Sequence, residues 1–421
     1  MDSTAPHTNH RTHAYRDMYE QGVAEASFLW LLRSLKIEQP QHTVTVVAEL
    51  ETRVQNELDG LMTSPDLGWA CCEPTLAFGE PGEQFTATVI ALRSHETRHI
   101  QTAVETGLSN RRATQGLISA LGWLESDIVQ PWIGRFLNSK DLNHKFLGIA
   151  ACSVRREDPG ELLTSILKRE DCQKHTALHA RALRLIGECR RRDLMNALQA
   201  AAGSQEPSMA FWAHWSTILL GQHTAVKNLQ PLVFKRGPFQ ARAIQLAFRV
   251  LPIEQAREWI SAMAKDPENA RAVIIATGVL GDPHAVNWLI GKMADPLLAR
   301  LAGEAFTFIT GVDLVQHQPH EDPHNGGAPI PNDDENDAQV DMDDDENLSW
   351  PDGEKIAALW RYHGANFRVG QRYFLGKPIT PDWLRSQINA GTLRQRHAAA
   401  LELALIDPLS RLINTRAKVT P

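Results

Sequence analysis

The stretch ARAVIIATGVLGDPHAVNWLI, residues 270–290, decides the fold of this chain. Ala272 and Ala276 lie four residues apart, so they share one face of a helix and let a neighbouring helix approach closely. Gly281 ends that helix as a C-terminal capping glycine does. The pair 282–283, Asp followed by Pro, is the usual start of the next helix. The stretch therefore predicts a helical hairpin.

The same pattern recurs along most of the chain, with a small-residue helix that ends in an apolar residue and a breaker. Successive copies end 29 to 34 residues apart, which is the spacing of a helical-repeat protein. A hairpin of this size buries its apolar face only by stacking on its neighbours, so the repeats predict an all-α solenoid of HEAT-like hairpins. The other copies are GLISALG (116–122), FLGIAACS (146–153), ARALRLIG (180–187), FWAHWSTILLG (211–221), ARAIQLAFRVLP (241–252) and LARLAGEAFTFITG (298–311).

Composition shifts divide the rest of the chain. Two amphipathic helices joined near Pro40 form an expected N-terminal cap, and a dense set of Pro and Gly residues after them predicts a linker. The predicted order is a disordered N-terminus (1–20), a helical cap (21–62), a linker or loop (63–84), the repeat array (85–315), a disordered, flexible acidic insert (316–349) and a C-terminal helical cap region (350–421).

The charge is unevenly distributed over the 421 residues, whose formal net charge is −7. Residues 321–346 hold 11 acids and no Lys or Arg, which leaves 43 basic residues against 39 acids elsewhere. Like charges at that density repel one another and cannot bury apolar surface, so we expect the insert to be flexible. The remaining body is only mildly basic, which gives little support to a dedicated nucleic-acid-binding protein.

Cysteine usage and hydropathy set the expected compartment. The five cysteines are scattered and form no C-x-x-C pair, which favours buried thiols in a reducing compartment. The first residues lack the apolar core of a secretory signal, and the repeat body has no stretch apolar enough to span a bilayer. We therefore expect a cytoplasmic protein without a membrane segment.

One motif suggests an enzyme. His95-Glu96-Thr97-Arg98-His99 matches H-E-x-x-H, in which two His on one helical face hold zinc and the Glu activates a water. Charged Arg residues interrupt the motif here, and no third ligand is evident in a supporting pattern. We therefore favour a chance match on a solvated helix and keep a zinc hydrolase using His95, Glu96 and His99 as the alternative.

Basic residues recur at roughly one-repeat intervals in the array, notably at Arg155, Arg156, Arg190, Arg191 and Arg192. Equivalent positions of a solenoid align, so these residues are candidates for a basic ridge. Three interpretations stay open: solvated helix ends, a surface for an acidic protein partner, and a surface for nucleic acid. The acidic insert is also a candidate to fold over the ridge and shield it.

Several segments resemble those of a known family. They are EASFLWLLRS (25–34), SALGWL (119–124), MADPLLARLAGEAFTFITGVDL (293–314), PNDDENDAQVDMDDDENLSWPDGEKI (331–356), GQRYFLGKPIT (370–380) and RQRHAAALELAL (394–405). The resemblance is to a proteobacterial HEAT-repeat family often encoded beside type VI secretion genes. It covers roughly residues 20–410, and the family has no assigned catalytic residues.

The resemblance implies a non-enzymatic adaptor or chaperone-like accessory protein that binds a secreted effector, a spike-tip protein or a related secretion component. It also marks Trp350, Arg372, Arg394 and Arg396, which lie in the family-like segments, as candidate partner-binding residues. We predict a protein-binding scaffold with no cofactor and no membrane association. The identity of the partner and the oligomeric state stay open.

Overall fold

The computed structural model describes residues 7–317 and 345–419, and nearly every regular element in this part of the chain is a helix. Helical hairpins follow one another along the chain, so the predicted all-α solenoid of HEAT-like repeats is confirmed. The strands among the described residues are two short ones, β1 (Tyr373–Phe374) and β2 (Lys377–Pro378), which pair antiparallel. No described helix combines the length and the apolarity needed to cross a bilayer.

The chain divides into two compact units. The first unit consists of Met1–Leu220 together with Arg411–Pro421, and the second unit consists of Gly221–Ser410. The chain therefore leaves the first unit after Leu220 and returns to it at Arg411. Each unit has its own apolar core.

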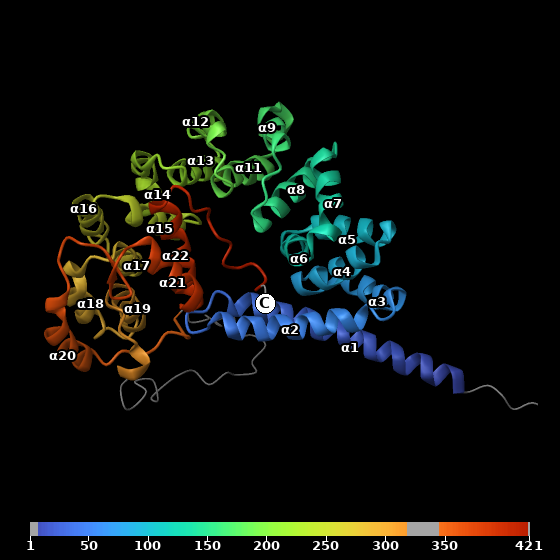
Figure 1. Ribbon diagram of the computed structural model, residues 1–421, viewed down its shortest axis with the longest axis horizontal. Coiled ribbons are helices and arrows are strands. Elements are labelled where there is room, and N and C mark those ends of the chain that lie inside the picture. The colour runs from blue at the N-terminus through green and yellow to red at the C-terminus, as the bar shows by residue number, and fades with distance from the viewer. Residues whose placement is uncertain (1–6, 318–344, 420–421) are drawn as a thin grey trace, which may run out of the picture. The chain divides into compact units, whose positions relative to one another are not determined.

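The first unit contains thirteen α-helices and two 3-10 helices among its described residues (Figure 1). They are α1 (His7–Lys36), α2 (Val44–Leu61), α3 (Pro65–Cys72), η1 (Glu73–Phe78), α4 (Pro81–Ser94), α5 (Thr97–Ser109), α6 (Arg111–Trp123), α7 (Ser126–Asn138), α8 (Leu142–Arg155), α9 (Glu161–Lys168), α10 (Glu170–Lys174), α11 (Thr176–Glu188), η2 (Arg192–Leu194), α12 (Met195–Ala201) and α13 (Pro207–Leu219).

Helices α4, α6, α8, α11 and α13 pack in series, each against the next. Small residues permit this close packing. A Cβ added at Gly187 of α11 would lie 2.8 Å from the Cα of Ser216 in α13. Local side chains also fix where helices begin. The Asn110 side chain accepts a hydrogen bond from the Ala113 amide at 2.9 Å and so caps the N-terminus of α6.

The second unit contains the remaining elements. They are η3 (His223–Leu229), α14 (Gln230–Phe234), α15 (Gln240–Val250), α16 (Ile253–Met263), η4 (Pro267–Asn269), α17 (Ala270–Leu280), η5 (Pro283–Ala285), α18 (Val286–Lys292), α19 (Ala299–Thr310), η6 (Leu314–His317), α20 (Gly353–His363), η7 (Gly364–Asn366), β1, β2, α21 (Pro381–Ala390) and α22 (Leu393–Ile406). Helices α15, α17 and α19 continue the serial packing within this unit.

Gly281 has two roles in the second unit. Its φ of +73° places it in the left-handed region, where it ends α17 as predicted. Its carbonyl also accepts a hydrogen bond from the Tyr373 amide at 2.8 Å, and a Cβ at this position would lie 2.2 Å from the Tyr373 carbonyl oxygen. Asp282 then caps η5, so the predicted start of the next helical segment is confirmed.

Three predicted boundaries differ from the structure. Helix α1 begins at His7, inside the N-terminus that we expected to be disordered. The expected linker 63–84 holds α3, η1 and the start of α4, because its prolines occupy first-turn helical positions, where a missing N–H is tolerated. Most of the acidic insert, residues 318–344, lies outside the described residues, but its last part does not: Asp345 and Leu348 are buried in the second unit.

Candidate functional site: the groove that holds the return segment

Residues Arg411–Val419, here called the return segment, lie on the first unit without forming a helix or a strand. In Figure 1 the segment is the red coil that runs to the C label. A single turn shapes it. The Ala417 amide donates to the Asn414 carbonyl at 3.1 Å, and the Arg416 amide donates to the Asn414 side-chain oxygen at 3.2 Å. Asn is suited to this turn because its short side chain mimics a backbone carbonyl.

A buried ion pair holds one end of the return segment. Arg33 of α1 donates to a single oxygen of Glu51 in α2 through Nε at 3.0 Å and through a terminal nitrogen at 2.7 Å. That terminal nitrogen also reaches the carbonyl oxygens of Arg416 and Ala417, at 2.9 and 3.1 Å. The second oxygen of Glu51 accepts the Val419 amide at 2.7 Å. The cation of the pair therefore binds carbonyl groups of the segment, and the anion binds an amide group.

An aromatic platform receives Lys418. Its ammonium lies 4.6 Å from the centre of the Trp123 ring and donates to the side-chain oxygen of Gln55 at 2.9 Å. The same Gln55 oxygen accepts the Trp123 indole N–H at 3.2 Å, which fixes the platform in place. A cation over the face of Trp is attracted to the negative face of the ring. Nearby, Arg416 forms an exposed ion pair with Glu38 at 2.8 Å.

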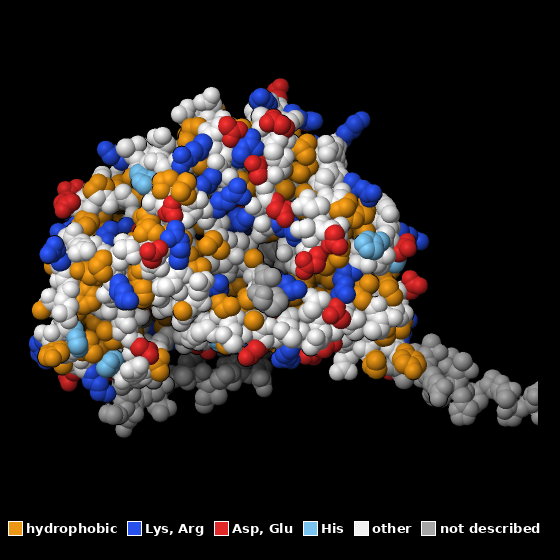
Figure 2. All heavy atoms as spheres, viewed as in Figure 1, with side chains coloured by type: hydrophobic (Ala, Val, Ile, Leu, Met, Phe, Trp, Pro, Cys, Tyr) orange, Lys and Arg blue, Asp and Glu red, His pale blue; other side chains and the backbone are white. Residues whose placement is uncertain are grey.

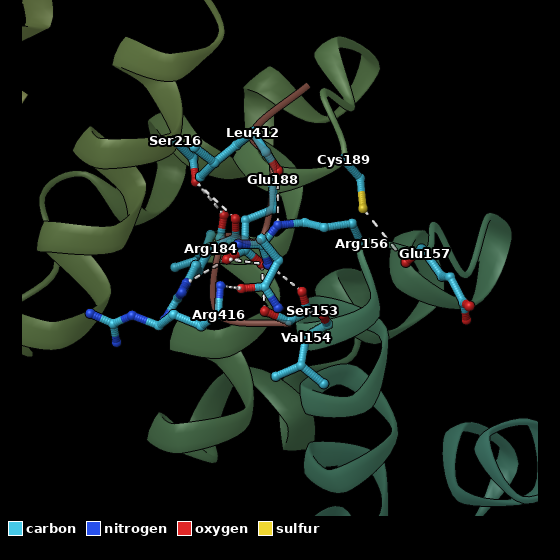
Figure 3. Close-up of polar contacts among 12 residues, drawn as sticks. Ser153, Val154, Arg156, Glu157, Arg184, Glu188, Cys189, Ser216, Leu412 and Arg416 are labelled. Atoms are coloured by element: carbon cyan, nitrogen blue, oxygen red, sulfur yellow. Dashed lines mark hydrogen bonds and ion pairs between the residues drawn. The ribbon is translucent and has the colours of Figure 1, made fainter. Parts of the chain in front are cut away.

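The C-terminal end of α8 holds the other end of the segment. The Asn414 side-chain amide donates to the Val154 carbonyl at 2.7 Å, and Arg156 Nε donates to the Leu412 carbonyl at 3.0 Å. Arg156 has a φ of 58° and caps α8 in the left-handed region. Figure 3 shows its guanidinium between the Leu412 carbonyl and the carboxylate of Glu188.

Glu188 of α11 is the centre of an arginine cluster. Arg184 and Arg156 pair with one of its oxygens at 2.8 and 3.0 Å, and the Ser153 hydroxyl donates to the other. Burial opposes ionisation of Glu188, but the positive charges of Arg184, Arg156 and Arg181 and the Ser153 hydrogen bond hold its pKa below the usual value. Burial, together with Arg184, lowers the pKa of Arg181 to about 10. Positive charge therefore exceeds negative charge in this cluster.

The groove contacts both the backbone and the side chains of the return segment. We use the word groove for the surface formed by seven residues that make polar or cation–π contacts with the return segment, which are Arg33, Glu38, Glu51, Gln55, Trp123, Val154 and Arg156. They bind three carbonyls and one amide of the segment, groups that every chain presents. No residue between positions 411 and 419 is fully buried. The segment is thus attached by polar contacts and contributes little to the apolar core.

Most of the predicted basic ridge is engaged inside the first unit. Arg155 donates to the carbonyls of Leu121 and Leu124 in the preceding repeat, at 3.1 and 2.8 Å. Arg191 binds the Gly160 carbonyl and Asp158, both at 3.0 Å, and so makes the equivalent connection one repeat later. These two arginines join neighbouring repeats.

The other three ridge residues are placed differently. Arg156 contacts the return segment, Arg190 donates to the Leu219 carbonyl at 3.2 Å, and Arg192 is exposed at the start of η2. On the face in Figure 2, Lys and Arg side chains are interspersed with Asp and Glu. The role of the ridge in partner binding stays a prediction.

The candidate residues in the second unit also make internal contacts. Arg372 binds both oxygens of the buried Glu402, at 2.9 and 2.8 Å, and the carbonyls of Leu280 and Arg249. It therefore fastens the segment before β1 to the ends of two repeat helices.

The same is true of the other three. Arg394 pairs with Glu304 of α19 at 3.0 Å, and Arg396 donates to the Ile388 carbonyl. The ring of Trp350 lies 4.6 Å below the guanidinium of Arg300. Each candidate partner-binding residue of the second unit therefore has a contact within that unit.

The H-E-x-x-H motif does not lie on one helix. His95 ends α4 with a left-handed φ of 59°, Glu96 precedes α5 as its N-cap, and His99 lies in α5. His99 stacks on Trp69, with ring centres 4.6 Å apart. The shared helical face that the zinc interpretation requires is therefore not formed, which corrects the placement of the motif on a single helix. No group of three or more metal-binding side chains occurs among the described residues.

The five cysteines are buried free thiols, as the sequence favoured. Burial raises the pKa of Cys152 and of Cys189 to about 12, so both are protonated and weakly nucleophilic at neutral pH.

Sequence reasoning missed the groove. Glu51 and Asn414 lie in no motif, and Arg33 lies in the family-like segment 25–34 without being marked there as a candidate site residue. The return segment falls within the predicted C-terminal cap region. The one available signal was the alternation of Asn414, Arg416 and Lys418 in a polar stretch after the last repeat helix. Comparison of the chain with family models, with curated proteins and with solved structures gave no match in any of the three.

Proposed function

We propose that this chain is a non-enzymatic protein-binding scaffold whose first unit takes a short irregular segment of a partner protein into the groove. The observation that carries the proposal is the return segment itself. Residues 411–419 are held without secondary structure, through their own carbonyl and amide groups. A groove that binds one such segment through its backbone has the chemistry to bind another.

The architecture supports the proposal. Stacked helical hairpins present long continuous surfaces for protein recognition. The groove draws on the first helix pair and on the ends of two repeat helices, so it follows this stacked surface across α1, α2, α6 and α8.

The family resemblance suggests where the partner is to be sought. We propose a secreted effector, a spike-tip protein or another type VI secretion component, with the chain acting as its adaptor or chaperone. The zinc-hydrolase and nucleic-acid interpretations stay predictions, and the first of them has lost its helical geometry.

Affinity capture from the native cell lysate, with a pair of matched variants, tests the proposal. Gln55 lies in the groove beneath Lys418, and Asn56 is its exposed neighbour on α2. Gln55→Trp fills the groove, whereas Asn56→Trp adds the same bulk outside it. A partner that is enriched by the wild type and by Asn56→Trp but lost with Gln55→Trp supports the proposal. An identical protein set with all three baits, or none with any, counts against it.

A further inference from the structure

The side chains of the return segment show what the groove prefers beyond a backbone. Asn414 uses both ends of its amide, since Oδ1 accepts the Arg416 amide at 3.2 Å and Nδ2 donates to the Val154 carbonyl at 2.7 Å. Asp at this position has no donor for Val154, and the longer Gln does not close the same tight turn. The groove therefore selects Asn at the turn.

Basic residues stand two and four positions after Asn414, at Arg416 and Lys418. Arg416 pairs with Glu38 at 2.8 Å, and Lys418 lies over Trp123 while donating to Gln55. The charge of Glu51 is balanced by Arg33, and its second oxygen binds the Val419 amide, so Glu38 is the carboxylate that faces a basic side chain of the segment. Glu38, Trp123 and Gln55 are thus complementary to the basic side chains of a segment with the pattern Asn-x-Arg-x-Lys, in which Arg or Lys fits the middle position.

The contacts of the return segment are also of a kind that opens easily. Ile413 is 46% exposed, and Leu412 is only partly buried. When the segment leaves, Arg33 keeps both hydrogen bonds to Glu51, so the buried charges remain paired. Release of the segment removes its contacts with the second oxygen of Glu51, with Gln55 and with Trp123. Segments with few buried apolar contacts open at low cost relative to global unfolding.

Tethering gives the return segment an advantage over a free competitor. A covalently attached ligand has an effective concentration of about millimolar for short flexible links. A partner with the same side-chain pattern therefore replaces it only when it binds more tightly or is held close by a second contact.

We propose that the groove is a recognition site for a basic Asn-x-[Arg/Lys]-x-Lys turn segment of the partner, and that the return segment is a cis-acting competitor which the partner displaces. This inference rests on the proposed function and specifies the chemistry of the ligand. In this proposal the chain regulates access to its own groove, because the return segment occupies the groove until a partner displaces it.

A peptide-binding experiment on the full chain tests the inference. The probe is a fluorescein-labelled peptide with the sequence of residues 410–419, SRLINTRAKV. The full chain is compared with the double variant Asn414→Ala/Lys418→Ala, which weakens the return segment and leaves every groove residue intact. Fluorescence anisotropy gives the dissociation constant of the peptide.

We expect the double variant to bind the peptide at least tenfold more tightly than the wild type. Adding Gln55→Lys places a like charge under the peptide lysine and is expected to abolish this gain, whereas Asn56→Lys adds the same charge outside the groove and is expected to preserve it. A peptide with Asn replaced by Asp and Lys by Glu is expected not to compete.

Other outcomes overturn the inference. Equal affinity for wild type and double variant, or affinity indifferent to Gln55→Lys, shows that the groove does not recognise this segment. Loss of cooperative thermal unfolding in the double variant shows that the return segment is a structural part of the fold and cannot be displaced. A partner captured in a groove-dependent manner together with a negative peptide result retains the proposed function and rejects this inference. Peptide binding without such a partner does the reverse.

Discussion

Arg33 donates two hydrogen bonds to one carboxylate oxygen of Glu51, at 3.0 and 2.7 Å, and leaves the other oxygen for a different part of the chain. Both side chains are buried, with Arg33 and Glu51 6% and 3% exposed. The free oxygen accepts the Val419 amide. One ion pair thus joins α1 to α2 and supplies two of the seven groove residues, so the Glu51 carboxylate contributes both to the stability of the fold and to binding of the return segment.

Glu51→Gln is expected to destabilise the first unit by about 3 kcal/mol, because it leaves the guanidinium of Arg33 buried without its counter-charge. Urea denaturation measures the change in the free energy of unfolding. Glu25→Gln is the matched control, since Glu25 pairs with Arg53 at the surface and such pairs contribute at most about 1 kcal/mol. Equal losses in the two variants would show that the Arg33–Glu51 pair carries no special weight.

Asn414→Ala is expected to loosen the return segment. It removes the turn acceptor and the bond to Val154, so the Val419 amide on Glu51 becomes more exposed to solvent exchange. Amide hydrogen exchange at Val419 is predicted to accelerate at least tenfold, which corresponds to about 1.4 kcal/mol. Ile413→Ala, at a half-exposed position of the same segment, should leave the rate nearly unchanged. Unchanged exchange in Asn414→Ala would refute the turn as the organising contact.

Gly187→Ala and Gly134→Ala are expected to act in opposite directions. The first places a methyl group 2.8 Å from the Cα of Ser216 between α11 and α13, and overpacking of this kind costs about 1–3 kcal/mol. The second lies within α7 with no atom within 4 Å of its new Cβ, so it should stabilise the helix by about 0.5–1 kcal/mol. Thermal unfolding of both variants measures the sign. Stabilisation by both would contradict the close approach of α11 and α13.

Two glutamates, the buried Glu188 and the partly buried Glu304, are expected to give opposite pH dependences. The pKa of Glu188 is held below its ordinary 4.5, since Arg184, Arg156 and Arg181 outweigh the burial that raises it. The unfolded state then binds more protons, so the stability due to Glu188 is complete above about pH 5 and is lost as the pH falls. Burial raises the pKa of Glu304 above 4.5 despite Arg394. Its native state binds more protons, so its contribution declines as the pH rises through 4.5 and above.

Stability profiles of Glu188→Gln and Glu304→Gln, each subtracted from the wild type between pH 3 and pH 8, isolate these two slopes. The difference for Glu188 should shrink toward acid, and the difference for Glu304 should shrink toward neutral pH. Slopes of the same sign would contradict the assignment of the two environments.

His95→Gly tests the broken H-E-x-x-H geometry directly. His95 has a left-handed φ at the end of α4, a position that favours glycine, so the substitution should stabilise the chain by about 1 kcal/mol. A His in the middle of a helix would instead make the same change destabilising by about 0.5–1 kcal/mol. The melting temperature distinguishes the two cases.

The repeat helices were predictable because their signals are local. Small residues followed by a breaker located α17 and α19, and the left-handed glycines 281 and 311 end them. The groove was not predictable, because its contacts join residues far apart in sequence, such as Glu51 and Val419. The internal contacts of the candidate arginines were not predictable for a related reason. Arg155 and Arg372 bind backbone carbonyls, and because every residue carries a carbonyl, the amino-acid sequence does not show which one an arginine will bind.

The return of the chain to the first unit has a consequence for biosynthesis. The groove is fully encoded once Arg156 has been translated, but its occupant follows only after the entire second unit, from Gly221 to Ser410. At about 5–20 residues per second, ribosomes leave the nascent groove empty for on the order of half a minute. The proposed partner would meet no competitor during that interval, so the proposed function favours loading during translation.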